Sequence, residues 1–307
     1  MGSPADFAQT TTLTQVTSVR TCGDHGYIAT PGQLWAWFCT TNALARALGL
    51  MPFKDVFRAD PDVAGDHGEP EALLSALSTG PVGLGDRVGR FDPALAMRTC
   101  RADGVLIKPH VPIAATSRSM LANAGFRDTL MVAECWSDHP AGRWTYVTTM
   151  RCSPGDAITS GTVSLSDLGD AAPTGDVVVW NWRTGATSRL PATGSWTATL
   201  AAEEWEHHVV APVLAGGIAV IGDTSKFVTA GDARVAVSTT RDQATGDEVV
   251  RLVVLGANET VTITGWSERA PARDGARVDH DAVSGVWSID VVVPARGWVS
   301  VEITPAT

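Results

Sequence analysis

The apolar pattern of the chain changes near residue 110, and this change limits the folds that the sequence can adopt. Before it, short apolar runs alternate with helical stretches, as in β-α units that build a parallel sheet. In the last helical stretch, we expect Asp92 to be the N-cap and Pro93 the first helical residue. Three such units are too few to close a (β/α)8 barrel, which takes roughly 250 residues. The expected strands are 15–20, 51–57 and 80–85, and the expected helices are 32–49, 69–78 and 92–101.

Beyond residue 110, short β-rich runs follow one another at close spacing and are broken by Gly, Pro, Asp and Asn. This pattern is typical of antiparallel sandwiches. The predicted fold class is therefore α/β plus all-β, namely the C-terminal portion of a TIM-type (β/α)8 barrel followed by an antiparallel β-sandwich region. The expected division is into β-α units at 1–112, a β-sandwich at 113–214, and further sandwich strands or a second β module at 215–307.

Composition excludes several classes of partner. The net charge is −10, with no block of like charge, which argues against nucleic acid and against an anionic membrane surface. No apolar run reaches the roughly 20 residues of a membrane span, and the opening residues lack the pattern of a signal peptide. The cysteines form an odd set without C-x-x-C spacing, which favours reduced thiols in a cytoplasmic protein. They are Cys22, Cys39, Cys100, Cys135 and Cys152.

Neither a metal nor an organic cofactor is expected. The adjacent pair His207 and His208 could suggest a metal, but neighbouring residues on a strand point to opposite faces. "GLGDRVG" at 83–89 approaches a dinucleotide-binding turn, but its third glycine falls one residue too late for G-x-G-x-x-G.

The motif "RTCGDHGY" at 20–27 directly follows the first predicted strand. Barrel enzymes keep their catalytic residues at this end of parallel strands. Taken alone, Asp24 reads as a Gly-flanked turn residue that caps local backbone. Arg20, four residues earlier, could bind a sugar hydroxyl or pair with an acidic side chain on the surface.

Several motifs, in this order, resemble the α-galactosidase clan, glycoside hydrolase families 27 and 36. They are "RTCGDHGY", "STGPVGLGDRVGRFDPALAMRTCRADGVLIKP" and "AEEWEHHVVAPVLAGGIAVIG". The chain is most similar to the raffinose synthase and alkaline α-galactosidase group of family 36, and the resemblance covers nearly all of its length. It implies a retaining hydrolase or galactosyl transferase whose substrate is an α-galactoside oligosaccharide of the raffinose type. It also implies that Asp24 is the catalytic acid/base, while Arg20 and Asp55 contact the sugar.

The sequence departs from this group at two places. Where the group has Asp-Trp-Asp before Met-Phe, this chain has Phe53-Lys54-Asp55-Val56-Phe57, which puts galactose specificity in question. The family nucleophile, an aspartate in a K-x-D strand, has no counterpart here. We therefore expect a missing N-terminal barrel half upstream, and an inactive chain without it. Two alternatives stay open: a non-catalytic carbohydrate-binding protein with a degenerate barrel remnant, and a structural β-sandwich module.

Overall fold

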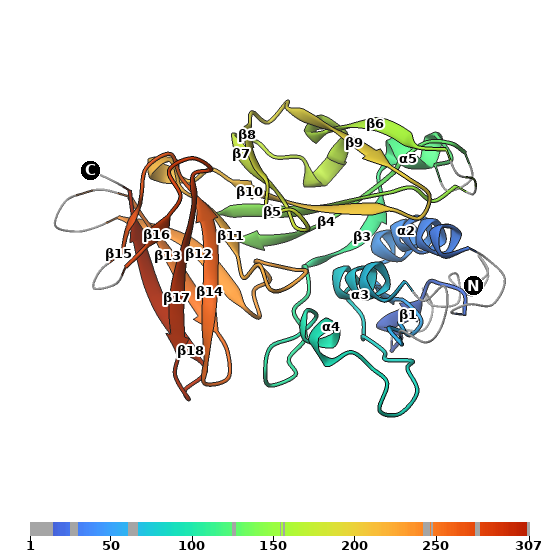
Figure 1. Cartoon of the computed structure of the whole chain (residues 1–307), viewed down its shortest axis with the longest axis horizontal. Helices are drawn as coiled ribbons and strands as arrows, with labels where there is room; N and C mark the ends of the chain where they lie inside the picture. The colour runs from blue at the N-terminus through green and yellow to red at the C-terminus, as the bar shows by residue number, and fades with distance from the viewer. Residues whose placement is uncertain are drawn as a thin grey trace.

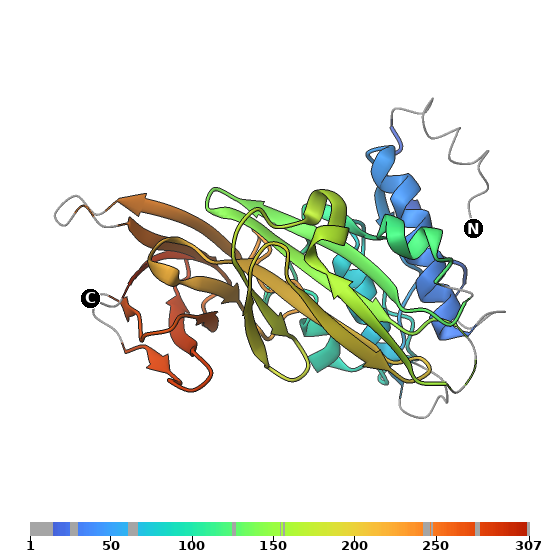
Figure 2. The same cartoon turned by 90° about the horizontal axis from the view of Figure 1, so that it is seen from above.

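The computed structural model describes residues 15–24, 30–60, 67–124, 127–153, 155, 157–241, 246, 248–273 and 277–305. It is a mixed structure, mostly β-strands in several antiparallel sheets with few helices (Figure 1). The N-terminal helices lie at one end of the molecule and the C-terminal strands at the other, in both views (Figures 1 and 2). No described helix has the length and apolar character needed to cross a membrane.

The N-terminal region contains the parallel pairing that the β-α pattern predicts. Strand β1 (Ser18–Arg20) pairs in parallel with β2 (Met51–Phe53), with α2 (Pro31–Ala47) between them in the chain. Among the described residues, the only further parallel pairing is the isolated bridge between Phe57 and Leu84, which lie on either side of α3 (Gly68–Leu77) in the chain. The described residues therefore form no barrel.

The expected strand at 80–85 is thus reduced to one bridging residue. Pro81 has no N–H to donate to a ladder. A Cβ atom on Gly85 would overlap the side chain of Val56, so this segment passes very close to its neighbour. Close approach and a missing donor explain why the segment is extended without being a regular strand.

Local sequence signals set the ends of the helices. Thr30 and Gln33 form a capping box at the start of α2, with Pro31 as the first helical residue. Gly49 follows the helix at φ 68°, a conformation that glycine adopts without strain. In α4 (Pro93–Met97), the Asp92 side chain accepts hydrogen bonds from Ala94 N and Leu95 N, which confirms the predicted cap.

A six-stranded antiparallel sheet forms the middle of the molecule. Its spatial order is β3-β4-β5-β10-β7-β8, so the late strand β10 lies between two earlier ones. Helix α2 packs against β3. The strands are β3 (Val111–Ala115), β4 (Met131–His139), β5 (Gly142–Met150), β7 (Val177–Asn181), β8 (Thr187–Leu190) and β10 (Trp205–Pro212).

A smaller layer adjoins this sheet. Strands β6 (Thr159–Ser164) and β9 (Ser195–Leu200) pair as an antiparallel ribbon. The ribbon lies with the short helix α5 (Ser117–Leu121) and the 3-10 helix η1 (Leu165–Ala171) on the same side of the molecule (Figure 1).

Two four-stranded sheets form the C-terminal part, after the 3-10 turn η2 (Ala215–Gly217). Side chains alternate between buried and exposed along their long strands, as in a sheet with one face in a core. The first contains β11 (Ala219–Gly222), β14 (Glu259–Trp266), β16 (Asp279–His280) and β17 (Val286–Val293). The second contains β12 (Val235–Arg241), β13 (Glu248–Leu255), β15 (Ala272–Arg273) and β18 (Trp298–Thr304).

One cluster of buried apolar side chains extends from the N-terminal region through the six-stranded sheet into the C-terminal sheets. It begins with Cys22 beside β1, continues through Trp35 and Trp144, and reaches Trp287 and Ile303 in the C-terminal sheets. The helices of the parallel region are therefore fixed against the antiparallel sheets by a continuous core.

Candidate functional site

Polar side chains follow both parallel strands of the N-terminal region. Arg20 is the last residue of β1, Asp24 lies four positions further on, and Asp55 comes two residues after β2. Because the strands are parallel and in register from Ser18 with Met51, their carboxyl ends meet at the same edge. Residues that are 35 positions apart in sequence are thereby brought together.

Arg20 connects the two predicted carboxylates. Its Nη2 lies 2.8 Å from Asp24 Oδ1, and its Nη1 lies 3.4 Å from Asp55 Oδ1. The exposed fractions of the side chains are 40% for Arg20, 62% for Asp24 and 22% for Asp55. The structure thus places all three sequence-predicted site residues in one cluster that solvent reaches. His25 and the rest of the motif lie outside the described residues.

A buried ion pair lies next to this cluster and was not predicted. Lys54 Nζ pairs with Glu71 Oε2, and both side chains are almost completely buried. Trp35 Nε1 donates a hydrogen bond of 2.5 Å to Glu71 Oε1. The pair connects Lys54, the residue after β2, to helix α3. It therefore fixes the backbone directly before Asp55. A charged residue among apolar neighbours is a sign of burial, and Lys54 and Glu71 each have such neighbours. The sequence does not show that the two residues pair with each other.

Cys22, between Arg20 and Asp24 in the chain, is fully buried. Burial raises the pKa of its thiol to about 11, only partly offset by the nearby Lys54 ammonium. Because the thiolate is the reactive form of cysteine, Cys22 is a packing residue and not a nucleophile for this site.

The two adjacent histidines, His207 and His208, are buried side chains of the six-stranded sheet. His207 contacts Thr148 Oγ1 at 3.2 Å and Phe227 O at 3.0 Å, while His208 contacts Asn181 Nδ2 at 3.2 Å. Burial lowers the pKa of His207 to about 3 and that of His208 to about 4. Among the described residues, no group of three or more His, Cys, Asp or Glu side chains is arranged to hold a metal ion.

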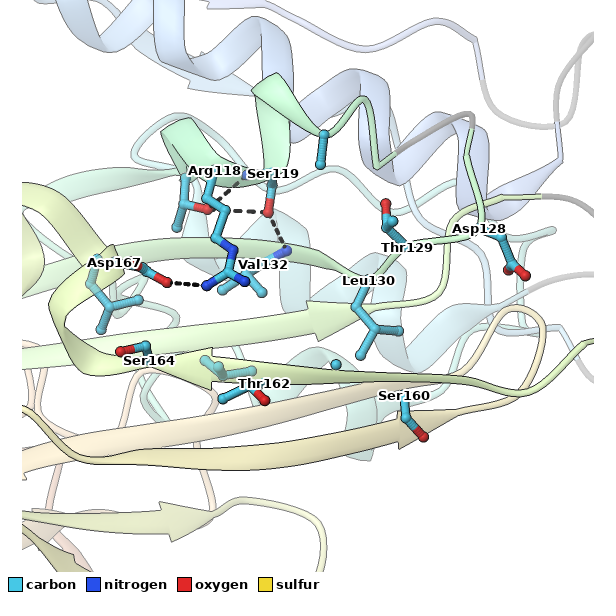
Figure 3. A pocket seen from close by; sticks show the side chains of 15 residues that line it. Arg118, Ser119, Asp128, Thr129, Leu130, Val132, Ser160, Thr162, Ser164 and Asp167 are labelled. Carbon is cyan, nitrogen blue, oxygen red and sulfur yellow. Dashed lines mark hydrogen bonds and ion pairs between the residues drawn. The ribbon is translucent and has the colours of Figure 1, made fainter.

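A separate cavity of about 250 Å³ lies between α5, η1 and β6 (Figure 3). Its lining combines many hydroxyl groups with apolar side chains such as Leu130 and Val132. The charged side chains at the cavity are paired: Arg118 Nη1 lies 2.5 Å from Asp167 Oδ2, and Asp128 Oδ1 lies 2.8 Å from Arg151 Nη2. The hydroxyl residues are Thr116, Ser119, Thr129, Ser160, Thr162 and Ser164. The sequence gives no signal for this cavity, because its serines and threonines are scattered along the chain and come together only in the folded protein.

Comparison with known proteins found distant structural similarity. No protein-family profile matches the sequence, and no curated protein matches it. Among solved structures, the chain is similar to the isomalto-dextranase of Arthrobacter globiformis T6 complexed with panose, a glycoside hydrolase. The TM-score is 0.41 and the sequence identity 14%, over 95% of this chain and 56% of that one. This chain therefore spans about half the length of that protein.

Proposed function

We propose that this chain is part of a retaining glycoside hydrolase or galactosyl transferase that acts on α-galactoside oligosaccharides. One observation carries the proposal: Arg20, Asp24 and Asp55 converge at the carboxyl ends of two adjacent parallel strands. This is the edge at which α/β enzymes keep their reacting groups. The motif resemblance to the raffinose synthase group assigns a role to each of the three residues.

In the proposed mechanism, Asp24 is the acid/base. Its carboxyl group protonates the departing glycosidic oxygen, and its carboxylate then removes a proton from the attacking water or sugar hydroxyl. An exposed fraction of 62% leaves room for a substrate oxygen to approach. The Arg20 guanidinium lies against the Asp24 carboxylate with one nitrogen and faces Asp55 with another, and in this proposal Arg20 and Asp55 both contact sugar hydroxyls.

A retaining reaction also needs a nucleophilic carboxylate roughly 5–5.5 Å from the acid/base. We propose that an aspartate of a K-x-D strand supplies it from a segment encoded upstream of this sequence. Hydrolysis and galactosyl transfer differ in whether water or a sugar hydroxyl attacks the glycosyl-enzyme intermediate.

The described cysteines are free and four of the five are buried, which supports a proposal of a reducing, cytoplasmic location.

The genomic sequence before the Met1 codon is the first test. We expect an in-frame extension that encodes β-α units and a K-x-D strand. An in-frame stop codon at that place would contradict the proposed enzyme. The 307-residue chain alone is expected to release no nitrophenol from aryl α-galactosides above the buffer rate.

The second test is Asp24→Asn in the extended protein. The asparagine keeps the shape but carries no transferable proton, so turnover of raffinose should fall roughly 10²- to 10⁴-fold. Aryl galactosides with a good leaving group should lose less in the glycosylation step. Added azide, which needs no base, should restore turnover and give a galactosyl azide of retained configuration. The matched control is Asp290→Asn, an exposed aspartate on β17 that should leave the kinetics unchanged.

Equal losses on both substrates without an azide product would show that Asp24 is a turn residue.

A second candidate function, non-catalytic carbohydrate binding, is favoured by the hydroxyl-lined cavity of Figure 3. Its charges are paired, so a neutral sugar suits it. Titration of raffinose into Thr162→Val and Asp55→Asn variants separates the two: cavity binding is lost only in the first, and binding at the predicted site only in the second.

A further inference from the structure

A second pocket, of about 630 Å³, opens where the N-terminal region meets the antiparallel sheets. Three distant segments form it: the α3–α4 region, the turn after β7 and the turn after β11. Two hydrogen bonds join the turn after β11 to the α4 region: Phe227 N donates to Arg98 O at 3.1 Å, and Lys226 Nζ donates to Met97 O at 2.7 Å. The lining residues are Glu69, Ala94, Met97, Arg98, Trp182, Arg183, Thr224, Ser225 and Lys226. None of these residues belongs to the Arg20 cluster or to the cavity of Figure 3.

Lys226 is the unusual residue of this pocket. It is 7% exposed, and it makes no ion pair with a carboxylate anywhere in the described part of the chain. The nearby Asp223 carboxylate is bound by Arg234 at 2.7 Å and by Ser225 Oγ at 2.6 Å. Burial lowers the pKa of the Lys226 ammonium, although Asp223 partly opposes this. A buried ammonium that no carboxylate contacts directly is only partly compensated, and an anion in the pocket would compensate it further.

Two arginines add to the positive charge and are held in place by aromatic rings. The Arg98 guanidinium lies 4.9 Å from the centre of the Trp182 ring, and its Nη1 pairs with Glu69 at 2.5 Å. The Arg183 guanidinium lies 4.8 Å from the centre of the Trp205 ring and donates to Trp205 O at 3.3 Å. Stacking restricts both side chains, so they lose less freedom when they bind a ligand.

The lining thus combines three cations with a single carboxylate, in a protein whose net charge is −10. Two of the cations are arginines, whose planar forks match the oxygens of a phosphate or a carboxylate. The volume exceeds that needed for an inorganic ion and suits a sugar-sized molecule. We propose that this pocket binds a monosaccharide-sized ligand that carries one phosphate or carboxylate group, with the anionic group held by Lys226 and Arg183. This inference is independent of the proposed catalytic function.

The test is isothermal titration of the full chain with four probes: galactose 6-phosphate, galacturonate, inorganic phosphate and neutral galactose. We expect at least one of the two charged sugars to bind at least tenfold more tightly than galactose, with an affinity that falls as salt rises. Whichever charged sugar binds more tightly identifies the anionic group. Inorganic phosphate should bind more weakly than the favoured sugar. Equal affinities for galactose and for both charged sugars would overturn the proposal, and so would phosphate binding as tightly as the favoured sugar.

Two variants assign the binding to this pocket. Lys226→Met keeps most of the side-chain length without the charge, and Arg183→Gln removes the charge of an exposed side chain. Each should weaken binding of the favoured charged sugar about tenfold or more, while far-ultraviolet circular dichroism stays unchanged. The matched control is Arg118→Gln at the cavity of Figure 3, which should bind as the parent does. Unchanged affinity in both pocket variants, or a loss in the control alone, would contradict the assignment.

Discussion

The parallel and antiparallel regions of this protein are held together in different ways. Strands β1 and β2 are three residues long, whereas β4 and β5 are nine residues long and pair along their whole length. Backbone ladders stabilise the antiparallel sheets. In the parallel region, helices α2 and α3 and the buried Lys54–Glu71 pair take that role. Because β1 and β2 are short, polar residues follow soon after each strand begins, and the candidate catalytic cluster lies at their carboxyl ends.

Helix α2 links the two regions through polar side chains as well as through the apolar core. Asn42 accepts from Thr21 Oγ1 at 2.5 Å and donates to Ile113 O at 2.9 Å. Arg46 Nη1 lies 2.7 Å from Glu134 Oε1 on β4. The short strand β1 is therefore positioned by a helix that is itself bonded to the long sheet. The six-stranded antiparallel sheet therefore helps, through α2, to position the cluster of Arg20, Asp24 and Asp55.

The largest expected effect concerns the buried pair of the parallel region. Lys54→Met removes the ammonium that pairs with the buried Glu71 carboxylate, which should lower the free energy of unfolding by about 3–5 kcal/mol. Urea unfolding followed by tryptophan fluorescence measures it. The double variant Lys54→Met with Glu71→Gln removes both charges and should recover much of the loss. A single variant as stable as the parent would show that the pair does not hold this region together.

A smaller effect is expected in the antiparallel region. Gly265 on β14 lies opposite Trp287 on β17, and a Cβ atom there would overlap the indole ring. Gly265→Ala should therefore lower the free energy of unfolding by about 1–3 kcal/mol. Gly175→Ala is the matched control, because nothing lies within 4 Å of the position of its new Cβ atom. Equal melting temperatures for the two variants would contradict the close packing of these strands.

Much of the fold could be predicted because its signals are local. Helices α2, α3 and α4, the Asp92 cap and the β-rich second half all follow from spacing and composition over short stretches, whereas α5 was not predicted. A parallel sheet in the N-terminal region was also predicted, and β1 and β2 do pair in parallel. The proximity of Asp55 to Arg20 was not predicted. The expected strand at 80–85 was not found as a strand, since glycines and Pro81 interrupt it.

The unpredicted features depend on contacts between distant residues. The pairing of Lys54 with Glu71 requires knowledge of how α3 packs, and the position of β10 between β5 and β7 follows no rule of chain order. The pocket around Lys226 is built from three separate segments. No stretch of sequence contains such a feature by itself, so it becomes visible only after folding.

Stability in the antiparallel region should also depend on pH, gradually over several pH units. Burial lowers the pKa of His207 to about 3 and that of His208 to about 4, below the value of 6.5 expected in the unfolded chain. Between about pH 4 and 6.5 the unfolded chain therefore binds more protons, and stability falls as pH falls through this window. Each ring contributes a slope of at most about 1.4 kcal/mol per pH unit.

Urea unfolding of the parent and of His207→Gln at pH 4.5, 5.5, 6.5 and 7.5 measures this dependence. At pH 7.5 the ring is neutral in both states, so the difference there gives the packing loss alone. The slope between pH 4.5 and 6.5 should be lower in the variant. Parallel curves for the two proteins would show that His207 does not contribute to acid sensitivity.

The central position of β10 also determines the order in which the sheet can assemble on the ribosome. The hairpins β4–β5 and β7–β8 are each complete before residues 205–212 are synthesised, yet neither can join the other without β10. Until that strand emerges, β5 and β7 each have an open edge, and open edges pair readily with other chains. Closing the sheet then requires contacts between residues far apart in sequence, which slows folding. Nascent chains of this protein are therefore most vulnerable to aggregation just before β10 leaves the exit tunnel.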